Sequence, residues 1–131
     1  MVTATQRYTL KFHTTNKVVQ KCYLDFDGGY AYALQMPKED TKDTLLSRAP
    51  IGNSTTLDFT DYMMLNNFGH VQTFEVFTDD DGSKWAWVAT YASSTEKDSI
   101  GDQWASRIGV IPLDGTAKML VLFIHLLILT T

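Results

Sequence analysis

Short runs of alternating apolar and polar residues, separated by turn signals, make up most of the chain. Val, Ile, Thr, Tyr, Phe and Trp, the residues that favour strands, concentrate in these runs. The pattern predicts strands at 6–13, 17–24, 30–36, 44–48, 55–59, 71–78, 84–91 and 104–113. Short strands at this spacing indicate an all-β fold built from antiparallel hairpins or a meander.

Three hairpins are expected from the order of strands and turns. Asp27-Gly28 and Asp81-Gly82 each lie between two predicted strands. An Asp-Gly pair favours a type I′ turn, because both central residues of that turn need a positive φ. A third hairpin is expected to pair 84–91 with 104–113 across a longer polar loop. The recurring hairpin is compatible with the blades of a propeller, so we expect a partial β-propeller-like domain.

Helical periodicity is weak along the chain. Only the segment from Phe59 to Leu65 is compatible with a short helical turn, with Thr60 or Asp61 as its cap. The predicted fold class therefore stays all-β.

Composition excludes several classes of function. The 131 residues suffice for one domain. The chain has 11 Lys and Arg residues against 15 Asp and Glu residues, whereas a nucleic-acid binder usually carries a basic surplus. Nine acidic and two basic residues lie between Asp58 and Asp102, which argues against polybasic attachment to a membrane. The single cysteine, Cys22, excludes an internal disulfide and a multi-cysteine zinc site.

The two ends of the chain differ in character. The alternation from Tyr8 to Phe12 predicts a strand where a secretory signal would need an apolar run. Residues 119–129 are apolar except for His125, and this run is too short for a normal transmembrane span of about 20 residues. We therefore expect an all-β region over 1–117 and an apolar tail over 118–131. The tail is compatible with an added strand, a buried helix, an interfacial segment or the product of a shifted reading frame.

Several segments, in one order, resemble a known family. Val18-Val19-Gln20-Lys21 and Tyr30–Gln35 are followed by Gly69-His70-Val71-Gln72-Thr73-Phe74-Glu75, then by Trp87-Val88 and Trp104–Ile108. Together they resemble the N-terminal part of the helveticin J family, the large class III bacteriocins. The resemblance covers roughly residues 15–114.

The resemblance implies antibacterial action on related Gram-positive bacteria, ending in lysis or loss of viability. It also implies secretion and a propeller-type fold. Helveticin-like proteins are more than twice as long as this chain. The chain therefore resembles the first part of such a protein, ended by a truncation or frameshift near Asp114. A truncated product would stay in the cytoplasm.

The expected partner is a component of the target cell envelope, recognised by loops and strand residues at one end of the sheet. Phe68–Gln72 and the turn from Asp79 to Gly82 are candidate rim positions. The candidate binding residues are His70, Gln72, Asp79, Asp81, Trp85 and Trp87. Self-association through open sheet edges is also expected. No cofactor is expected.

Each candidate also has a structural interpretation. The run of three Asp residues before Gly82 fails the EF-hand test, because Phe77 and Val88 occupy the two key carboxylate positions. An acidic hairpin turn is the alternative to a calcium loop. His70 has no partner His at metal-ligand spacing, so it is compatible with a strand-edge histidine bonded to backbone. No metal site is expected.

No catalytic residue is expected. Cys22 lies inside a predicted strand with no His nearby, which favours a small buried side chain over a nucleophile. Asp25 and Asp27 are two residues apart beside Gly28, which favours turn formers over a carboxylate pair. Neither a Gly-x-Ser-x-Gly elbow nor a Walker loop occurs.

Aromatic side chains fall on alternating positions of two predicted strands. Such a row can stack on sugar rings or form the core of a sheet. The row consists of Tyr30, Tyr32, Trp85, Trp87 and Tyr91.

Three functions follow from these observations. The leading hypothesis is a non-enzymatic, envelope-binding bacteriocin. A wall-degrading enzyme domain is the second, and release of soluble glycan or peptide from cell walls would support it. The third is a non-functional product of a broken gene, for which open sheet edges and the apolar tail predict poor solubility.

Overall fold

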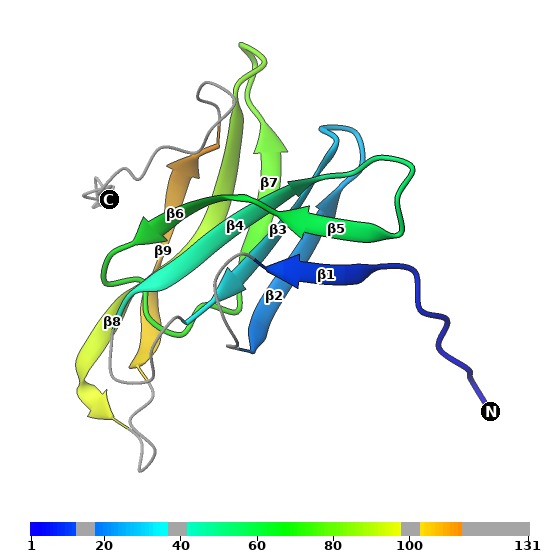
Figure 1. Ribbon diagram of the computed structural model, residues 1–131. Coiled ribbons are helices and arrows are strands. Elements are labelled where there is room, and N and C mark those ends of the chain that lie inside the picture. Colours follow the sequence, from blue (N-terminus) through cyan, green and yellow to red (C-terminus); the bar gives the residue numbers. More distant parts are fainter. Residues whose placement is uncertain (13–17, 37–41, 98–102, 114–131) are drawn as a thin grey trace.

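The computed structural model describes residues 1–12, 18–36, 42–97 and 103–113, and these form strands without any helix (Figure 1). The all-β prediction is thus confirmed. The expected tail at 118–131 and the side chain of Trp104 lie outside the described residues. The strands are β1 (Thr9–Phe12), β2 (Val19–Asp25), β3 (Tyr30–Gln35), β4 (Thr44–Pro50), β5 (Thr56–Phe59), β6 (Asp61–Leu65), β7 (Phe74–Thr78), β8 (Lys84–Lys97) and β9 (Gln103–Pro112).

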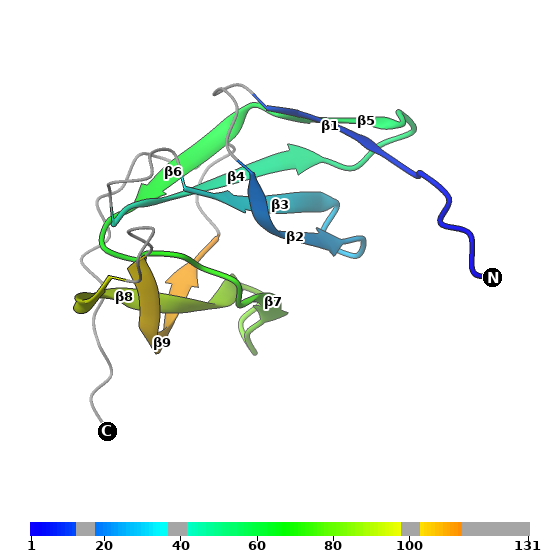
Figure 2. The ribbon, with the colours of Figure 1, turned by 90° about the horizontal axis from the view of Figure 1, so that it is seen from below.

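The strands form three sheets that stack as layers (Figure 2). The middle layer is a four-stranded antiparallel sheet in the order β2-β3-β4-β6. The antiparallel sheet β7-β8-β9 covers one of its faces, and the parallel pair β1-β5 packs on the other. The three expected hairpins are confirmed. The described sheets stay open, and a propeller is not shown.

The central strands of the middle sheet, β3 and β4, are buried on both faces. Along β3, Tyr32 and Leu34 point into one core cluster, whereas Ala31 and Ala33 point into a second. A strand buried on both faces reads as a continuous apolar run, which is how β3 appears in the sequence. The alanines leave room for the β1-β5 layer to approach the sheet closely.

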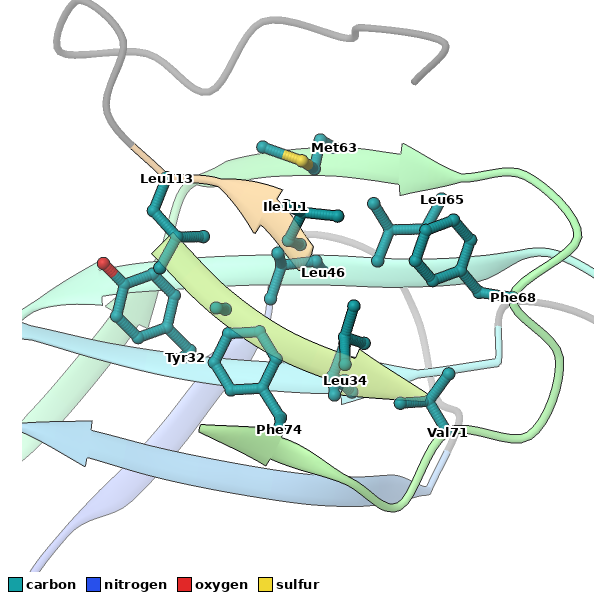
Figure 3. Packing of buried hydrophobic residues seen from close by; sticks show 12 residues of the cluster. Tyr32, Leu34, Leu46, Met63, Leu65, Phe68, Val71, Phe74, Ile111 and Leu113 are labelled. Atoms are coloured by element: carbon teal, nitrogen blue, oxygen red, sulfur yellow. The ribbon is translucent and has the colours of Figure 1, made fainter. Parts of the chain in front are cut away.

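The larger cluster lies between the middle sheet and the β7-β8-β9 sheet (Figure 3). Leu34 and Leu46 of the middle sheet meet Val88 of β8 and Ile111 of β9. The connection between β6 and β7 adds Phe68, which is fully buried. These contacts hold the two sheets together.

The second cluster fixes the β1-β5 layer. Leu57 and Phe59 of β5 are buried against the alanines of the middle sheet. The ring of Phe12 on β1 stacks on that of Phe59 with centroids 4.7 Å apart. This packing explains why β1 joins β5 in a parallel pair instead of extending the antiparallel sheet.

The turn between β2 and β3 is wider than a type I′ turn. Asp25 pairs with Tyr30 across the strands, and the backbone N–H of Gly29 donates to the Asp25 carbonyl at 2.9 Å. Gly29 alone in this turn has a positive φ, of 78°. The Asp25 carboxylate accepts the N–H of Gly28 at 3.0 Å, and such an Asx contact stabilises the wider loop.

The turn between β7 and β8 departs from the prediction in the same way. The N–H of Gly82 donates to the carbonyl of Asp79 at 2.9 Å, and only Gly82 has a positive φ there, of 87°. The type I′ prediction is therefore wrong for both Asp-Gly turns, because neither Asp27 nor Asp81 has a positive φ. The carboxylates of Asp25 and Asp81 accept backbone hydrogen bonds in these turns instead.

The segment expected to form a helical turn is mostly a strand. β6 pairs antiparallel with β4, and its residues Met63 and Leu65 are buried in the larger cluster. Met and Leu are good helix formers, but burying alternate side chains against β4 outweighs that preference. The expected helical turn at Phe59–Leu65 is therefore wrong.

Replacing Leu46 with Ala should lower the free energy of unfolding by about 2–5 kcal/mol, because the side chain is 0 % exposed and its removal leaves a cavity between two sheets. Urea unfolding followed by tryptophan fluorescence measures the loss. The control Ile108→Ala removes a side chain that is 61 % exposed and should change stability by only about 0.5 kcal/mol. Equal losses in the two variants would contradict the layered core.

Candidate functional site

Trp85 and Trp87 lie on the outer face of the β7-β8-β9 sheet. Their neighbours Ala86 and Val88 alternate with them along β8 and are fully buried in the larger cluster. The tryptophans therefore point away from the middle sheet. Trp87 is 46 % exposed, an unusual value for so large an apolar side chain.

The strand register places further apolar side chains beside the two tryptophans. Trp85 pairs with Phe77 on β7 and with Pro112 on β9, and Trp87 pairs with Val110 on β9. The rings of Phe77 and Trp87 stack with centroids 5.6 Å apart and planes 27° apart. We call Phe77, Trp85, Trp87, Val110 and Pro112 the outer aromatic face.

Two polar features belong to this face. Glu75 pairs with Trp87 across the strands and is exposed, so it adds a carboxylate beside the exposed ring. The indole Nε1 of Trp85 is buried and has no hydrogen-bond acceptor among the described residues. A buried donor left without a partner costs about 1–3 kcal/mol.

Tyr91 extends the exposed aromatic surface along β8. Its φ of 63° is left-handed, a strained conformation for a bulky residue. The guanidinium of Arg107 lies 4.0 Å from the centroid of its ring, and the Ser106 hydroxyl donates to its carbonyl at 3.0 Å. Strained residues of this kind often mark functional surfaces.

Asp79 and Asp81 lie at the tip of the β7-β8 hairpin. The Asp79 carboxylate accepts the N–H of Asp80 at 2.8 Å, and that of Asp81 accepts the N–H of Ser83 at 2.9 Å. Both carboxylates therefore stabilise the turn. Within the described ranges, no three His, Cys, Asp or Glu side chains gather in a way that would hold a metal ion.

The structure separates His70 from the tryptophans. Nε2 of His70 shares a short hydrogen bond with Oε1 of Gln20 on β2, so the ring joins the β6–β7 connection to the middle sheet. Gln72, two residues later, is exposed just before β7 begins. Of the six candidate residues, the structure thus groups Trp85 and Trp87 on one face, Asp79 and Asp81 at one end of β7, and Gln72 near the other end.

Gly69 explains why His70 occupies this position. Its φ of 74° turns the chain sharply, its N–H donates to the carbonyl of Lys42 at 2.8 Å, and its carbonyl accepts the Thr44 hydroxyl. Val71 and Phe74 then enter the larger cluster. The segment Gly69–Glu75, the strongest part of the resemblance, thus forms the sharp turn that connects the middle sheet to the β7-β8-β9 sheet.

The predicted aromatic row divides between two environments. Tyr32 is 3 % exposed and packs in the larger cluster, and Tyr30 lies against that cluster with the Arg48 guanidinium 4.5 Å from its ring centroid. The core interpretation therefore holds for the two tyrosines of β3. For Trp87 and Tyr91 it is wrong, because their rings lie on an exposed face.

The surroundings of Cys22 and Asp25 show what each side chain does in the fold. Cys22 is exposed on β2, so the expectation of a small buried side chain is wrong. The carboxylate of Asp25 caps the β2–β3 turn and lies 3.5 Å from Nζ of Lys84, which supports a structural role. It therefore links the middle sheet to β8.

Sequence reasoning missed three members of the outer aromatic face and the neighbouring Glu75. Phe77, Glu75, Val110 and Pro112 join the tryptophans through the register of β7, β8 and β9. Alternation along β7 would have grouped Phe77 with Glu75. The pairing across strands, which brings β9 to the tryptophans, is tertiary information.

Burial raises the pKa of Tyr32 to about 12, although the neighbouring Arg48 partly opposes the rise. Because the unfolded value is near 10, the folded state holds this proton more tightly. The resulting stability is complete below pH 10 and is lost as the pH rises to about 12. Across this window, wild type should lose stability more steeply than Tyr32→Phe in urea titrations. Parallel curves would contradict the shift.

Hydrogen bonds from the Ser83 hydroxyl and backbone lower the pKa of Asp81. Ser83→Ala removes the hydroxyl and should move the pKa of Asp81 up toward its ordinary value. Titration of the carboxyl carbon by NMR measures this change. Ser54→Ala, which removes a hydroxyl from another turn, should leave Asp81 unchanged, and an unshifted Asp81 in Ser83→Ala would disprove the assignment.

None of the described segments forms a helix long and apolar enough to cross a membrane. A family model described as bacteriocin helveticin-J matches residues 2–130, beyond both ends of the expected stretch 15–114. No match was found among curated proteins or among solved structures. The family match covers nearly the whole chain, and the chain therefore belongs to the helveticin-J bacteriocin family.

Proposed function

We propose that the chain is an antibacterial protein that acts on related Gram-positive bacteria by binding a component of their envelope, without catalysing a reaction. Membership of the helveticin-J bacteriocin family supports the antibacterial part. The proposal requires the chain to reach the outside of the producing cell. The outer aromatic face supports the binding part.

The exposed stack of Trp87 and Phe77 is the observation that carries the proposal. Leaving the Trp87 indole ring in water does not stabilise the fold, because apolar surface is stabilising only when water is excluded from it. Flat, rigid rings present a large contact area at a low cost in conformational entropy. They stack well on the apolar face of a sugar ring, and sugars are abundant in bacterial cell walls.

Polar groups border the outer aromatic face and can form hydrogen bonds with the hydroxyls of a sugar. Glu75 lies beside Trp87, while Asp79 and Asp81 lie at one end of β7 and Gln72 near the other. The three carboxylates and the amide oxygen of Gln72 accept hydrogen bonds from hydroxyls. The same charges repel phosphate-rich polymers, so the proposed target is a neutral glycan portion of the wall.

His70 lies in the connection that leads into β7, the strand that carries Phe77 and Glu75. Its contact with Gln20 and the corner at Gly69 set the direction in which the chain enters β7. We assign it a positioning role for Phe77 and Glu75 on that strand.

Trp87→Ala should weaken binding to purified walls of sensitive bacteria about tenfold or more, because central aromatic side chains dominate binding energies. A co-sedimentation assay over a range of wall concentrations measures the apparent Kd. Killing of sensitive cells should fall in parallel. Tyr62→Ala is the matched control, because Tyr62 is an exposed aromatic residue on β6 in a different sheet.

In both variants the urea concentration at half unfolding should differ from that of the wild type by no more than a typical surface substitution causes. If wild type does not sediment with walls, or if the two variants bind equally, the proposed binding face is wrong. Release of soluble glycan from the walls by the wild type would instead identify the protein as an enzyme.

A further inference from the structure

A cleft of about 480 Å³ lies on the other side of the molecule, away from the outer aromatic face. This volume is within the range of small-molecule sites, about 300–1,000 Å³. Its lining comes from three segments that are distant in sequence: Arg7 and Tyr8, Leu24 and Phe26, and Gly52–Thr55.

Hydrogen bonds hold the three segments in place. The N–H of Thr9 donates to the carbonyl of Thr55 at 2.8 Å, which fixes the N-terminal segment to the loop between β4 and β5. The N–H of Ile51 donates to the carbonyl of Gly29 at 2.9 Å, which ties the same loop to the β2–β3 turn. The Ser54 hydroxyl accepts the N–H of Thr56 at 3.0 Å. The cleft is therefore largely preformed, which lowers the cost of binding.

One wall of the cleft is apolar. Phe26 is 63 % exposed, and Leu24, two residues earlier on the same side of the chain, is also exposed. Single exposed apolar residues are common, but here two border a concave site together with the half-buried ring of Tyr8. A flat ligand with an apolar face would cover the Phe26 ring.

The opposite wall is polar. Asn53, Ser54 and Thr55 offer an amide and two hydroxyls, and the Asn53 amide makes no hydrogen bond to any part of the chain that the structure describes. Amides and hydroxyls both donate and accept, so they match the hydroxyl groups of a sugar.

Arg7 adds a positive charge at the edge. Within the described ranges its guanidinium forms no ion pair. Asp25, which lies between Leu24 and Phe26 in the sequence, forms an ion pair with Lys84. Asp27 is exposed in the same turn and weakens the positive potential. An arginine in such a position favours a carboxylate or a phosphate.

We propose that this cleft binds a sugar that carries one anionic group, with the ring on Phe26, the hydroxyls at Asn53–Thr55 and the anion at Arg7. The proposal goes beyond the outer aromatic face and does not depend on it. A carboxylate and a phosphate share the chemistry that Arg7 recognises, so the test contains both.

The proposal is tested by titrating the full chain with three probes that share one ring and following backbone amide shifts by NMR. The probes are glucuronate, glucose monophosphate and neutral glucose. At least one anionic probe should shift the amides of residues 7–8, 24–26 and 52–55 saturably and bind at least about fivefold more tightly than glucose. The tighter of the two identifies carboxylate or phosphate as the preferred anion.

Arg7→Gln should abolish the preference for the anionic probe while leaving glucose binding unchanged, and Phe26→Ala should weaken all binding. Lys11→Gln is the matched charge control, because Lys11 lies on β1 outside the lining and should have no effect. Trp87→Ala should also bind these probes as wild type does, which separates this test from that of the outer aromatic face. The absence of saturable shifts, or equal effects of Arg7→Gln and Lys11→Gln, would overturn the proposal.

Discussion

Burial of β3 and β4, the central strands of the middle sheet, on both faces is the constraint on which the other layers depend. Neither neighbouring layer has an independent core, because β1-β5 is only a pair of strands and β7-β8-β9 buries a single face. Ala31, Ala33 and Ala49 make one face of the middle sheet flat, and Leu34 and Leu46 make the other bulky. The two faces therefore accept different partners: aromatic rings of β1 and β5 on the flat side, and interdigitating side chains of β8 and β9 on the bulky side.

This arrangement also determines where the two proposed ligand surfaces lie. The β7-β8-β9 sheet uses Val88 and Ile111 on its inner face, so the face that we propose for envelope binding is the outer one. On the far side, β1 and β5 cover β3 and β4 but leave the end of β2 uncovered, and the cleft at Phe26 forms there. The motif Gly69-His70 contributes to the first of these arrangements, because its hydrogen bonds fix the connection between the middle sheet and β7.

The sequence alone predicted what depends on local pattern. It located the hairpins and grouped Trp85 with Trp87, because a strand repeats every two residues. The two-residue repeat of a strand divides its side chains into two sets but does not say which set faces the core. The sequence therefore could not decide whether the aromatic row forms the core of a sheet or an exposed surface. Strand β6 was missed because Met63 and Leu65 become a strand only by pairing with β4. The cleft was invisible for the same reason, since its three segments meet only in the folded chain.

The two proposed ligand surfaces lie on opposite sides of the layered stack, and this geometry bears on how they would act together. Two sites on one side of a molecule can hold a flat surface jointly, and their affinities then reinforce each other through a high effective concentration. The outer aromatic face and the cleft at Phe26 cannot both touch one flat surface. They can both be filled inside a porous network that surrounds the protein, such as a cell wall. In that setting Trp87 and Arg7 would reinforce each other on intact walls while acting independently on isolated sugars.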